Sequence, residues 1–455
     1  MSGDSSPTPE APSPYPQGRI RPRDRDAIVQ SLRAGVVPRL GHQHIQVGRA
    51  AEVKALLRDV DRVADGGSSV RFIIGEYGSG KTFFLQLVRS IALERKLVTM
   101  NADLSPDRRL QASGGQARSL YTELAHNFAT RAKPDGGALA SVVERFVSTT
   151  LAEASERGAE PAVVIAERLE SLSELVGGYD FAAVIGAYWR GHDVGDDALG
   201  SDAIRWLRGE FSTKTDARLA LGVRTIVDDA NWYDHLKLLA RFVRMAGFSG
   251  LLVCLDELVN LYKLAHTQSR NANYEQILRI VNDSLQGSVA GLGFVLGGTT
   301  DFLLDTRRGL YSYPALQSRL AENTFAVGGL VDYDGPVIRL ANLAPDDFYI
   351  LLTRLRHAYA SGDPAAYLLP DEALSAFMNH CAKRVGDAYF RTPRTTIKEF
   401  INLLAVLEQN PGATWDGLID RVEIAAEANP DLLALPGTGE RPSRADDDDL
   451  SSFRL

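Results

Sequence analysis

The chain has 455 residues, 45% hydrophobic and 24% charged, with a formal net charge of −8. These values fit a water-soluble protein and argue against a uniformly basic nucleic-acid-binding surface, although they leave room for a local basic stripe. The chain has only two cysteines, far apart, which argues against a disulfide framework or a zinc site. The N-terminus lacks the residue order of a signal peptide, and no apolar run approaches ~20 residues, so a membrane protein is not expected. A cytoplasmic location is therefore expected.

Both ends of the chain are predicted to be disordered. Residues 1–22 are rich in Pro, Ser and Gly, and residues 436–455 combine turn formers with an acidic run. Neither segment can bury enough apolar surface to offset the entropy of ordering it. The acidic run is interpreted as a solubilising tail rather than a partner-binding peptide.

Between the tails, short apolar runs alternate with helical patterns, which predicts an α/β core with a parallel sheet over residues 23–340. Five runs are predicted to be strands. Each is apolar on both sides, so helices should cover both faces of the sheet. The runs are Val70–Ile74, Leu97–Met100, Leu251–Leu255, Gly293–Gly297 and Val337–Leu340.

Two further regions are predicted to be helical. The segment between the second and third strands is too long for a loop. Its apolar residues recur at helical spacing in Leu139–Val147 and Ile165–Glu170, so we expect a long helical insertion at about 134–235. Residues 341–435 again show helical patterns and predict a C-terminal helical lid domain.

A phosphate-binding loop follows the first strand and opens a helix, which is the context that the motif G-x-x-x-x-G-K-[ST] requires. Glycines let successive backbone N–H groups point at phosphate oxygens, and the helix N-terminus favours negative charge. Lys81 should reach the β- and γ-phosphates of ATP, and Thr82 should ligate Mg²⁺. The expected ATP-binding residues are Gly75, Glu76, Tyr77, Gly78, Ser79, Gly80, Lys81 and Thr82.

An acidic pair ends the third strand. Asp256 is expected to hold the Mg²⁺ shell, and Glu257 is expected to orient and polarise the attacking water. Strands often end in solvated acids, but the phosphate loop upstream favours a hydrolysing ATPase over a passive binder.

Polar and basic residues after the fourth strand are further candidates. Thr299, with Thr300 as the alternative, is placed to contact the water or the γ-phosphate, unless it is only a solvated strand end. Arg319, on an expected helix, is a candidate for reaching the nucleotide of a neighbouring subunit in a homo-oligomer. Arg307 and Arg308 compete for this role, and a surface salt bridge is the other interpretation.

The lid contributes one more arginine. Pro393 suits the first turn of a helix and Thr392 its cap. Arg394 would then lie near a helix N-terminus that faces the nucleotide and would sense the γ-phosphate.

This order of motifs resembles an AAA+ P-loop ATPase of the origin-recognition and STAND-like branch. Gly48–Glu52 resembles the G-R-x-x-E segment of that branch, which implies that Gly48 and Arg49 lie near the adenine. Leu340–Pro345 resembles the start of its lid.

A closer resemblance is to the ATP-binding proteins of bacterial phage-exclusion (BREX) clusters, of the BrxD type, a shorter relative of BrxC. It covers nearly everything between the tails and implies defence against phage and other foreign DNA alongside partner proteins. The residues that carry it are Phe72–Phe84, Ala102–Arg109, Gly115–Arg118, Lys133–Gly137 and Arg205–Glu210.

Direct reading of a DNA sequence is not expected, because too few residues follow Phe400 to build the winged-helix domain that origin-recognition relatives often carry. A basic patch for the phosphates of DNA, without sequence specificity, is one interpretation of the arginines and lysine near residues 107–133. A solvated face paired with nearby acids is favoured instead. The residues in question are Arg108, Arg109, Arg118, Arg131 and Lys133, with Glu123 and Asp135 as the acids.

Three functions stay open from sequence. The first is an ATP-driven motor or switch in DNA-targeted defence. The second is a regulatory switch gated by nucleotide, and the third is a helicase or transposase loader. A small-molecule kinase is disfavoured by the lid arginine and the acidic pair.

Overall fold

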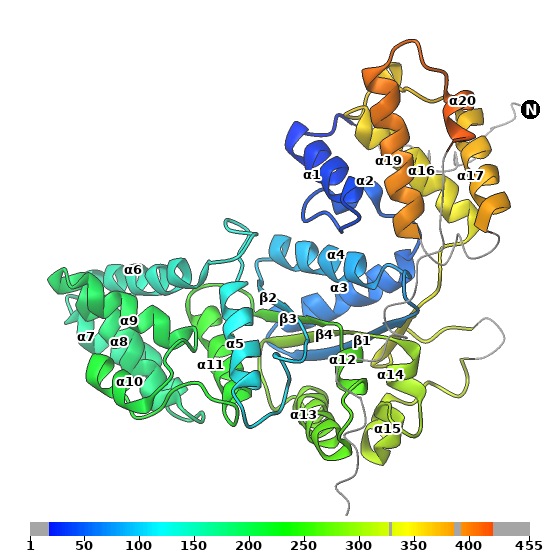
Figure 1. Cartoon of the computed structure of the whole chain (residues 1–455). Helices are drawn as coiled ribbons and strands as arrows, with labels where there is room; N and C mark the ends of the chain where they lie inside the picture. Colours follow the sequence, from blue (N-terminus) through cyan, green and yellow to red (C-terminus); the bar gives the residue numbers. More distant parts are fainter. Residues whose placement is uncertain (1–17, 327–329, 386–392, 422–455) are drawn as a thin grey trace, which may run out of the picture.

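The computed structural model describes residues 18–326, 330–385 and 393–421. Five parallel strands form one sheet in the order β2-β3-β4-β1-β5, at the centre of Figure 1. The strands are β1 Ser68–Gly75, β2 Val98–Asp103, β3 Leu251–Asp256, β4 Leu292–Gly298 and β5 Val337–Leu340. Each of the five apolar runs lies within or overlaps one of these strands, so the α/β prediction with a parallel sheet is confirmed.

Helices cover both faces of the sheet, as the apolar strands predicted (Figure 1). Residues alternate between the faces: Leu252 and Cys254 of β3 join the cluster beneath two helices, whereas Val253 joins the cluster on the opposite face. The first face carries α3 Ala50–Ala64 and α4 Lys81–Glu94. The second carries α5 Gln116–His126, α11 Trp232–Met245, α13 Thr267–Leu285 and α14 Thr300–Leu304, with α12 Val259–Tyr262, η2 Leu310–Ser312 and α15 Pro314–Leu320 nearby.

The segment between α5 and α11 is a helical bundle to one side of the sheet (Figure 1). Aromatic contacts join the bundle to the sheet layer: the ring centroids of Phe146 and Phe181 lie 5.1 and 5.5 Å from that of Phe242 on α11. The helical patterns of the sequence fall within this bundle. It consists of α6 Leu139–Arg157, α7 Pro161–Leu169, η1 Glu170–Leu172, α8 Gly178–Val194, α9 Asp197–Leu207 and α10 Lys214–Leu221.

The C-terminal helices form a second body with its own apolar cluster, which also contains the N-terminal helices (Figure 1). Residues 23–47 were expected to belong to the ATPase core, but Ile28, Ile45 and Val47 pack in the cluster of Phe400 and Leu404. The reason is that the apolar side of the first helix faces α19 instead of the sheet. The elements are α1 Pro22–Arg33, α2 His42–Ile45, α16 Pro345–Tyr359, η3 Pro364–Ala366, α17 Asp371–Val385, α19 Pro393–Gln409 and α20 Trp415–Ile419.

The last residues of the expected N-terminal tail are ordered. Ile20 is only 4% exposed, and its N–H donates to the carbonyl of Ser361 at 3.0 Å. The prediction of disorder was wrong for residues 18–22, because one apolar side chain and one backbone bond attach them to the lid. Residues 1–17 and the expected acidic tail 436–455 lie outside the described residues.

No helix within the described ranges is long and apolar enough to cross a membrane.

A buried ion pair joins α3 to β1. Arg71 and Asp59 are 4% and 5% exposed, and Nη2 of Arg71 donates to Oδ1 of Asp59 at 3.1 Å. The same guanidinium also donates to the carbonyl of Gly335, just before β5. The side chain of Arg71 therefore links β1 to α3 and to the segment before β5.

We expect Arg71→Met to lower the free energy of unfolding by about 3–5 kcal/mol, because it leaves the Asp59 charge buried without its partner. The double variant Arg71→Met/Asp59→Leu should recover most of this loss. Urea denaturation measures both. As a control, Arg95→Met breaks the exposed pair with Asp61 (3.0 Å) and should cost at most about 1 kcal/mol. A loss at Arg71 no larger than at Arg95 would contradict the prediction.

Candidate functional site

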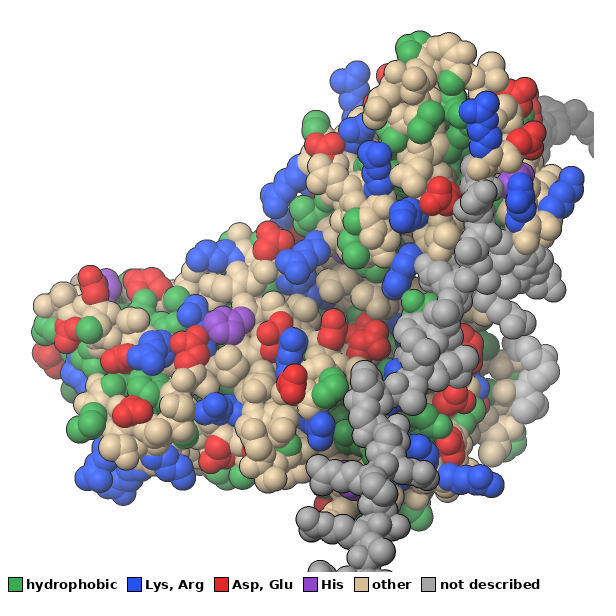
Figure 2. Space-filling model, in the orientation of Figure 1, with side chains coloured by type: hydrophobic (Ala, Val, Ile, Leu, Met, Phe, Trp, Pro, Cys, Tyr) green, Lys and Arg blue, Asp and Glu red, His purple; other side chains and the backbone are tan. Residues whose placement is uncertain are grey.

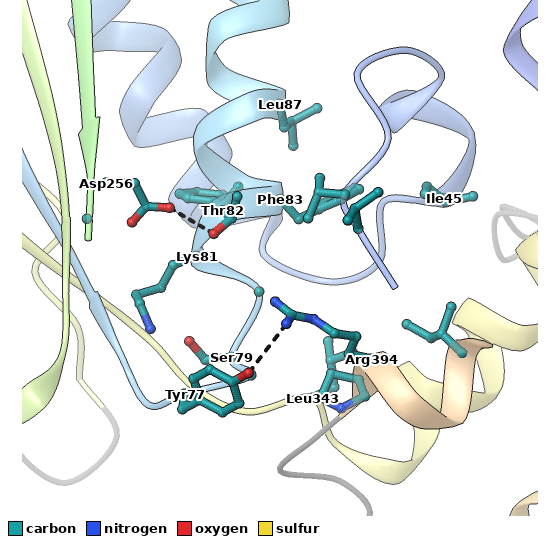
Figure 3. A pocket seen from close by; sticks show the side chains of 18 of the residues that line it. Ile45, Tyr77, Ser79, Lys81, Thr82, Phe83, Leu87, Asp256, Leu343 and Arg394 are labelled. Atoms are coloured by element: carbon teal, nitrogen blue, oxygen red, sulfur yellow. Dashed lines mark hydrogen bonds between the residues drawn. The ribbon is translucent and has the colours of Figure 1, made fainter. Parts of the chain in front are cut away.

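A pocket lies where the carboxyl ends of β1, β3 and β4 face the lid helix α19 (Figure 3). Parallel strands present their carboxyl ends at one edge of a sheet, and side chains from several loops converge there. The predicted site residues that line the pocket are Arg49, Tyr77, Gly78, Ser79, Gly80, Lys81, Thr82, Asp256, Glu257, Thr299 and Arg394. Gly48, Gly75, Glu76 and Arg319 do not line it.

The loop after β1 has the backbone that its glycines predict. Gly78 and Gly80 have φ of 78° and 83°, in the left-handed region that favours glycine. A Cβ on Gly75 would lie 2.4 Å from Oγ of Ser79, so a larger residue would push the loop open. Gly75 and Ser79 thus approach closely within the loop, directly before the N-terminus of α4, where anions bind favourably.

Lys81 lies over this loop. Its ammonium donates to the carbonyls of Gly75 at 3.0 Å and Glu76 at 2.9 Å. Gly75 and Glu76 therefore contribute carbonyl oxygens to the seat of the lysine, although they do not line the pocket. Phosphate oxygens in the loop would compete with these carbonyls for the three N–H groups.

The two predicted metal ligands are brought together. Thr82 Oγ1 donates to Oδ2 of Asp256 at 2.8 Å (Figure 3), and Asp256 is 6% exposed. A hydroxyl and a carboxylate are the hard oxygen ligands that Mg²⁺ takes, usually with substrate phosphates and water completing its shell. The described residues contain no group of three or more His, Cys, Asp or Glu that could hold a metal ion. The donor set thus fits Mg²⁺ bound together with a nucleotide, but not an all-protein metal cage.

Glu257 follows in a strained conformation. Its φ is 59°, and its N–H donates to Oδ1 of Asp256 at 2.9 Å. Left-handed backbone at a residue with a Cβ is uncommon and concentrates at functional sites. A Cβ on Gly297 of β4 would lie 2.3 Å from Oδ1 of Asp256, so this strand must carry glycine where it passes the acids.

Thr299 lines the pocket at the end of β4 and is 9% exposed. Its hydroxyl accepts from the N–H of Phe302 at 3.3 Å and so caps α14. Thr300, the alternative, is the first residue of α14 and does not line the pocket.

Arg394 reaches the loop from the lid. Its Nη1 donates to the hydroxyl of Tyr77 at 3.3 Å, and Cζ lies 5.9 Å from the centre of that ring (Figure 3). Pro393 occupies the first turn of α19, as predicted. Thr392, the expected cap, lies outside the described residues.

The arginines after β4 lie away from the pocket. Arg319 is exposed on α15, where Nε donates to Oδ1 of Asn282 at 2.5 Å and Nη1 to the carbonyl of Ala315 at 2.9 Å. Arg308 donates to the carbonyls of Tyr262 and Leu264. Neither these two nor Arg307 lines the pocket, so any role at a nucleotide would need a second chain.

Arg49 holds two backbone segments together. Its Nη2 donates to the carbonyl of Ser79 at 2.5 Å and to that of Ala341 at 2.9 Å. Desolvation lowers the pKa of the guanidinium, and the charges of Glu52 and Asp347 oppose this. Gly48 lies behind it, against Asp347.

An apolar wall of the pocket was not predicted from the sequence. It comes from the segment between α1 and α2, from the end of α2 and the turn after it, from the start of α4 and from the lid. It includes Val36, Val37, Pro38, Ile45, Val47, Phe83, Leu343, Leu351 and Ile397. The apolar run Val36–Pro38 was the only sequence signal of this wall, and a short apolar run does not show which cavity it will line. A planar, largely apolar ring would fit such a wall.

Asp103 was also missed. It ends β2 directly opposite Asp256 in the register, so both side chains lie on the α4 face of the sheet. Desolvation raises the pKa of Asp103, and the neighbouring Asp256 charge raises it further. The acidic residues at this end of the sheet therefore include Asp103 as well as the pair that the sequence motif indicated.

Two of the five basic residues of the suggested patch, Arg108 and Arg131, are paired with acids, and the acid Asp135 is paired with Arg23 outside the patch. Arg108 lies 3.5 Å from Glu123, Arg131 lies 3.2 Å from Glu94, and Asp135 lies 4.0 Å from Arg23. On the face that Figure 2 shows, acidic and basic side chains are interspersed. These pairs favour the solvated-face interpretation over a phosphate-binding patch.

The family comparison covers almost the whole described chain. The family model for the BREX system ATP-binding protein BrxC/D matches residues 20–423. The chain therefore belongs to this family, and the resemblance to BREX proteins noted in the sequence is confirmed. The search among curated proteins found no match.

Replacing Gly297 by alanine should displace the Asp256 carboxylate, because the new Cβ would collide with Oδ1. We expect the affinity for a fluorescent ATP analogue to fall about tenfold in Mg²⁺ but little in EDTA, since the change acts on the metal side of the site. Titration of the analogue under both conditions measures this. Gly200→Ala, on α9 with open space around it, is the control. Equal losses with and without Mg²⁺ would contradict the prediction.

Proposed function

We propose that this BREX family protein binds Mg²⁺·ATP in the pocket and hydrolyses it, acting as an AAA+-like motor or switch in defence against phage and foreign DNA. The observation that carries the proposal is the Thr82–Asp256 hydrogen bond beneath the phosphate loop, with Glu257 next in the chain and in the same pocket. A phosphate loop alone binds nucleotide, but a loop joined to two acids supports hydrolysis.

The loop and Lys81 would bind the phosphates. Thr82 and Asp256 would hold Mg²⁺, which supplies charge neutralisation on the β- and γ-phosphate oxygens when bound. The short link between these side chains fixes the ligands before nucleotide binds, so little reorganisation is needed.

Glu257 is the residue we assign to the attacking water. Its backbone is held in the left-handed region by the bond to Asp256, which directs the side chain differently from an ordinary strand end. Thr299 lies across the pocket at the end of β4, where its hydroxyl has capacity for a second hydrogen bond. We assign it a supporting contact to the water or the γ-phosphate.

The adenine would lie against the apolar wall, between the α1–α2 segment and the lid. Within the described chain, no backbone hydrogen bond engages the N–H or the carbonyl of Val37. This pair of groups suits the edge of an adenine, which offers one donor and one acceptor. Arg394, which lies beside Gly35 and Tyr77, would sense the γ-phosphate from the lid.

Its place in the defence system follows from family membership together with the site. Partner proteins of the same system, a homo-oligomer that uses Arg319 in trans, a cytoplasmic location and DNA contact without sequence specificity belong to the proposal. The alternative functions are a regulatory switch gated by nucleotide and a helicase or transposase loader. DNA-stimulated turnover would favour the motor, slow turnover with retained nucleotide the regulatory switch, and ATP-dependent capture of a helicase the loader.

Two substitutions separate binding from hydrolysis. Lys81→Ala should weaken ATP binding, because it removes the charge over the phosphate loop. Glu257→Gln should keep binding and reduce hydrolysis about 10²-fold or more, since the amide cannot polarise the water. Nucleotide titration and phosphate release measure the two effects. Hydrolysis by Glu257→Gln at the parental rate would remove Glu257 from the assigned role.

A role for Arg319 in trans would appear on dilution. If the arginine completes the site of a neighbouring chain, ATPase activity per chain should rise with protein concentration, and Arg319→Ala should abolish that rise. Arg157→Ala is the control, because this exposed arginine of α6 was not a candidate for the role. Activity independent of dilution, with Arg319→Ala still active, would exclude the role.

A further inference from the structure

A junction behind the phosphate loop joins four segments through Arg49. The arginine precedes α3, its guanidinium bonds the carbonyl of Ser79 in the loop, and it bonds the carbonyl of Ala341, the first residue after β5. The turn before it touches the lid: a Cβ on Gly48 would lie 3.4 Å from Oδ1 of Asp347 in the first turn of α16. The Arg49 side chain therefore joins the loop to the strand end, and the preceding Gly48 lies against the lid helix.

The lid side of this junction is itself hydrogen-bonded. Oδ2 of Asp347 accepts from the N–H of Ala344 at 3.3 Å and so helps to cap α16. Ala344 lies three positions after Ala341, whose carbonyl accepts from Arg49. A displacement of Ala341 would therefore act on the cap of the helix within one turn of chain.

The junction is strained and incompletely satisfied. Gly48 and Arg49 both have positive φ, 63° and 59°, and for the arginine this is an unfavourable conformation that its surroundings must enforce. Among the described residues, Nη1 of Arg49 and Oγ of Ser79 are buried without a hydrogen-bond partner. Buried unpaired donors are rare in proteins. A small movement of the phosphate loop or of the segment after β5 would let these groups form hydrogen bonds, which would favour a rearrangement of this contact.

We propose that Arg49 is a positioning residue that transmits nucleotide occupancy of the phosphate loop to the start of the lid helix α16. The inference rests on the proposed ATP site and names how that site is coupled to the lid. Phosphates that bind the loop reorient its peptide groups, and the carbonyl of Ser79 moves with them. The planar guanidinium then carries the movement to Ala341, because one of its nitrogens holds both carbonyls.

Hydrogen exchange of the full chain, with and without Mg²⁺ and the slowly hydrolysed analogue ATPγS, tests the coupling. In the parental protein the analogue should slow exchange in the phosphate loop, residues 75–84, and at the lid start, residues 341–352. In Arg49→Ala, with enough analogue to saturate the loop, the slowing at the lid start should fall about fivefold or more relative to the slowing in the loop. A purely structural role would change exchange without nucleotide, but not the difference that nucleotide makes.

Two further variants keep the test decisive. Arg49→Lys retains the charge if Arg49→Ala fails to fold, and it should lose the lid response as well, because the lysine side chain ends one bond short of Nη2, the atom that holds both carbonyls. Arg58→Ala, on the same helix, breaks only the exposed pair with Asp334 (2.6 Å) and should keep both responses.

The outcomes distinguish a failure of this inference from a failure of the proposed function. A lid response in Arg49→Lys equal to that of the parental protein would overturn the inference and leave the ATP site standing. An absence of slowing in the phosphate loop of the parental protein would instead overturn the proposed function.

Discussion

The hydrogen bond from Thr82 to Asp256 is the interaction on which the rest of the site depends. It joins the first turn of α4 to the end of β3, two elements separated by 174 residues of chain. Asp256 accepts this bond with one oxygen and the N–H of Glu257 with the other, so the same carboxylate fixes the strained turn that follows. Gly297 leaves the space that this carboxylate occupies, which makes β4 a part of the site without contributing a side chain.

The order of the strands explains why residues so distant converge. β4 lies between β1 and β3, so its polar end faces the gap between the phosphate loop and the acids. β5 lies on the other side of β1, and its end leads directly to Ala341 and the lid. One edge of the sheet therefore presents the phosphate loop, the acids and the start of the lid in a row.

Much of this was predictable because it is local in sequence. The five strands are short apolar runs, and the phosphate loop has fixed spacing between a strand and a helix. What failed was long-range. Ile20 and Ile28 lie in segments whose partner, the lid, comes more than 300 residues later, so composition alone assigned them to a tail or to the core. The position of Asp103 beside Asp256 follows only from the strand register, which the sequence does not reveal. The apolar wall needed the same kind of knowledge, since valines and a proline between two helices look like ordinary packing residues.

The two candidate arginines differ in what they require. Arg394 already lies at the pocket, and Tyr77 of the phosphate loop accepts its hydrogen bond. Its position depends on the lid, whose apolar cluster includes the N-terminal helices, so its contact with Tyr77 holds only while this composite lid faces the loop. Arg319 is held by Asn282 and Ala315 on the surface and reaches no part of its own pocket. A single chain thus supplies the loop, the acids and one arginine from the lid. Arg319 lines no part of that pocket, so the role in trans that we propose for it depends on how two copies are arranged.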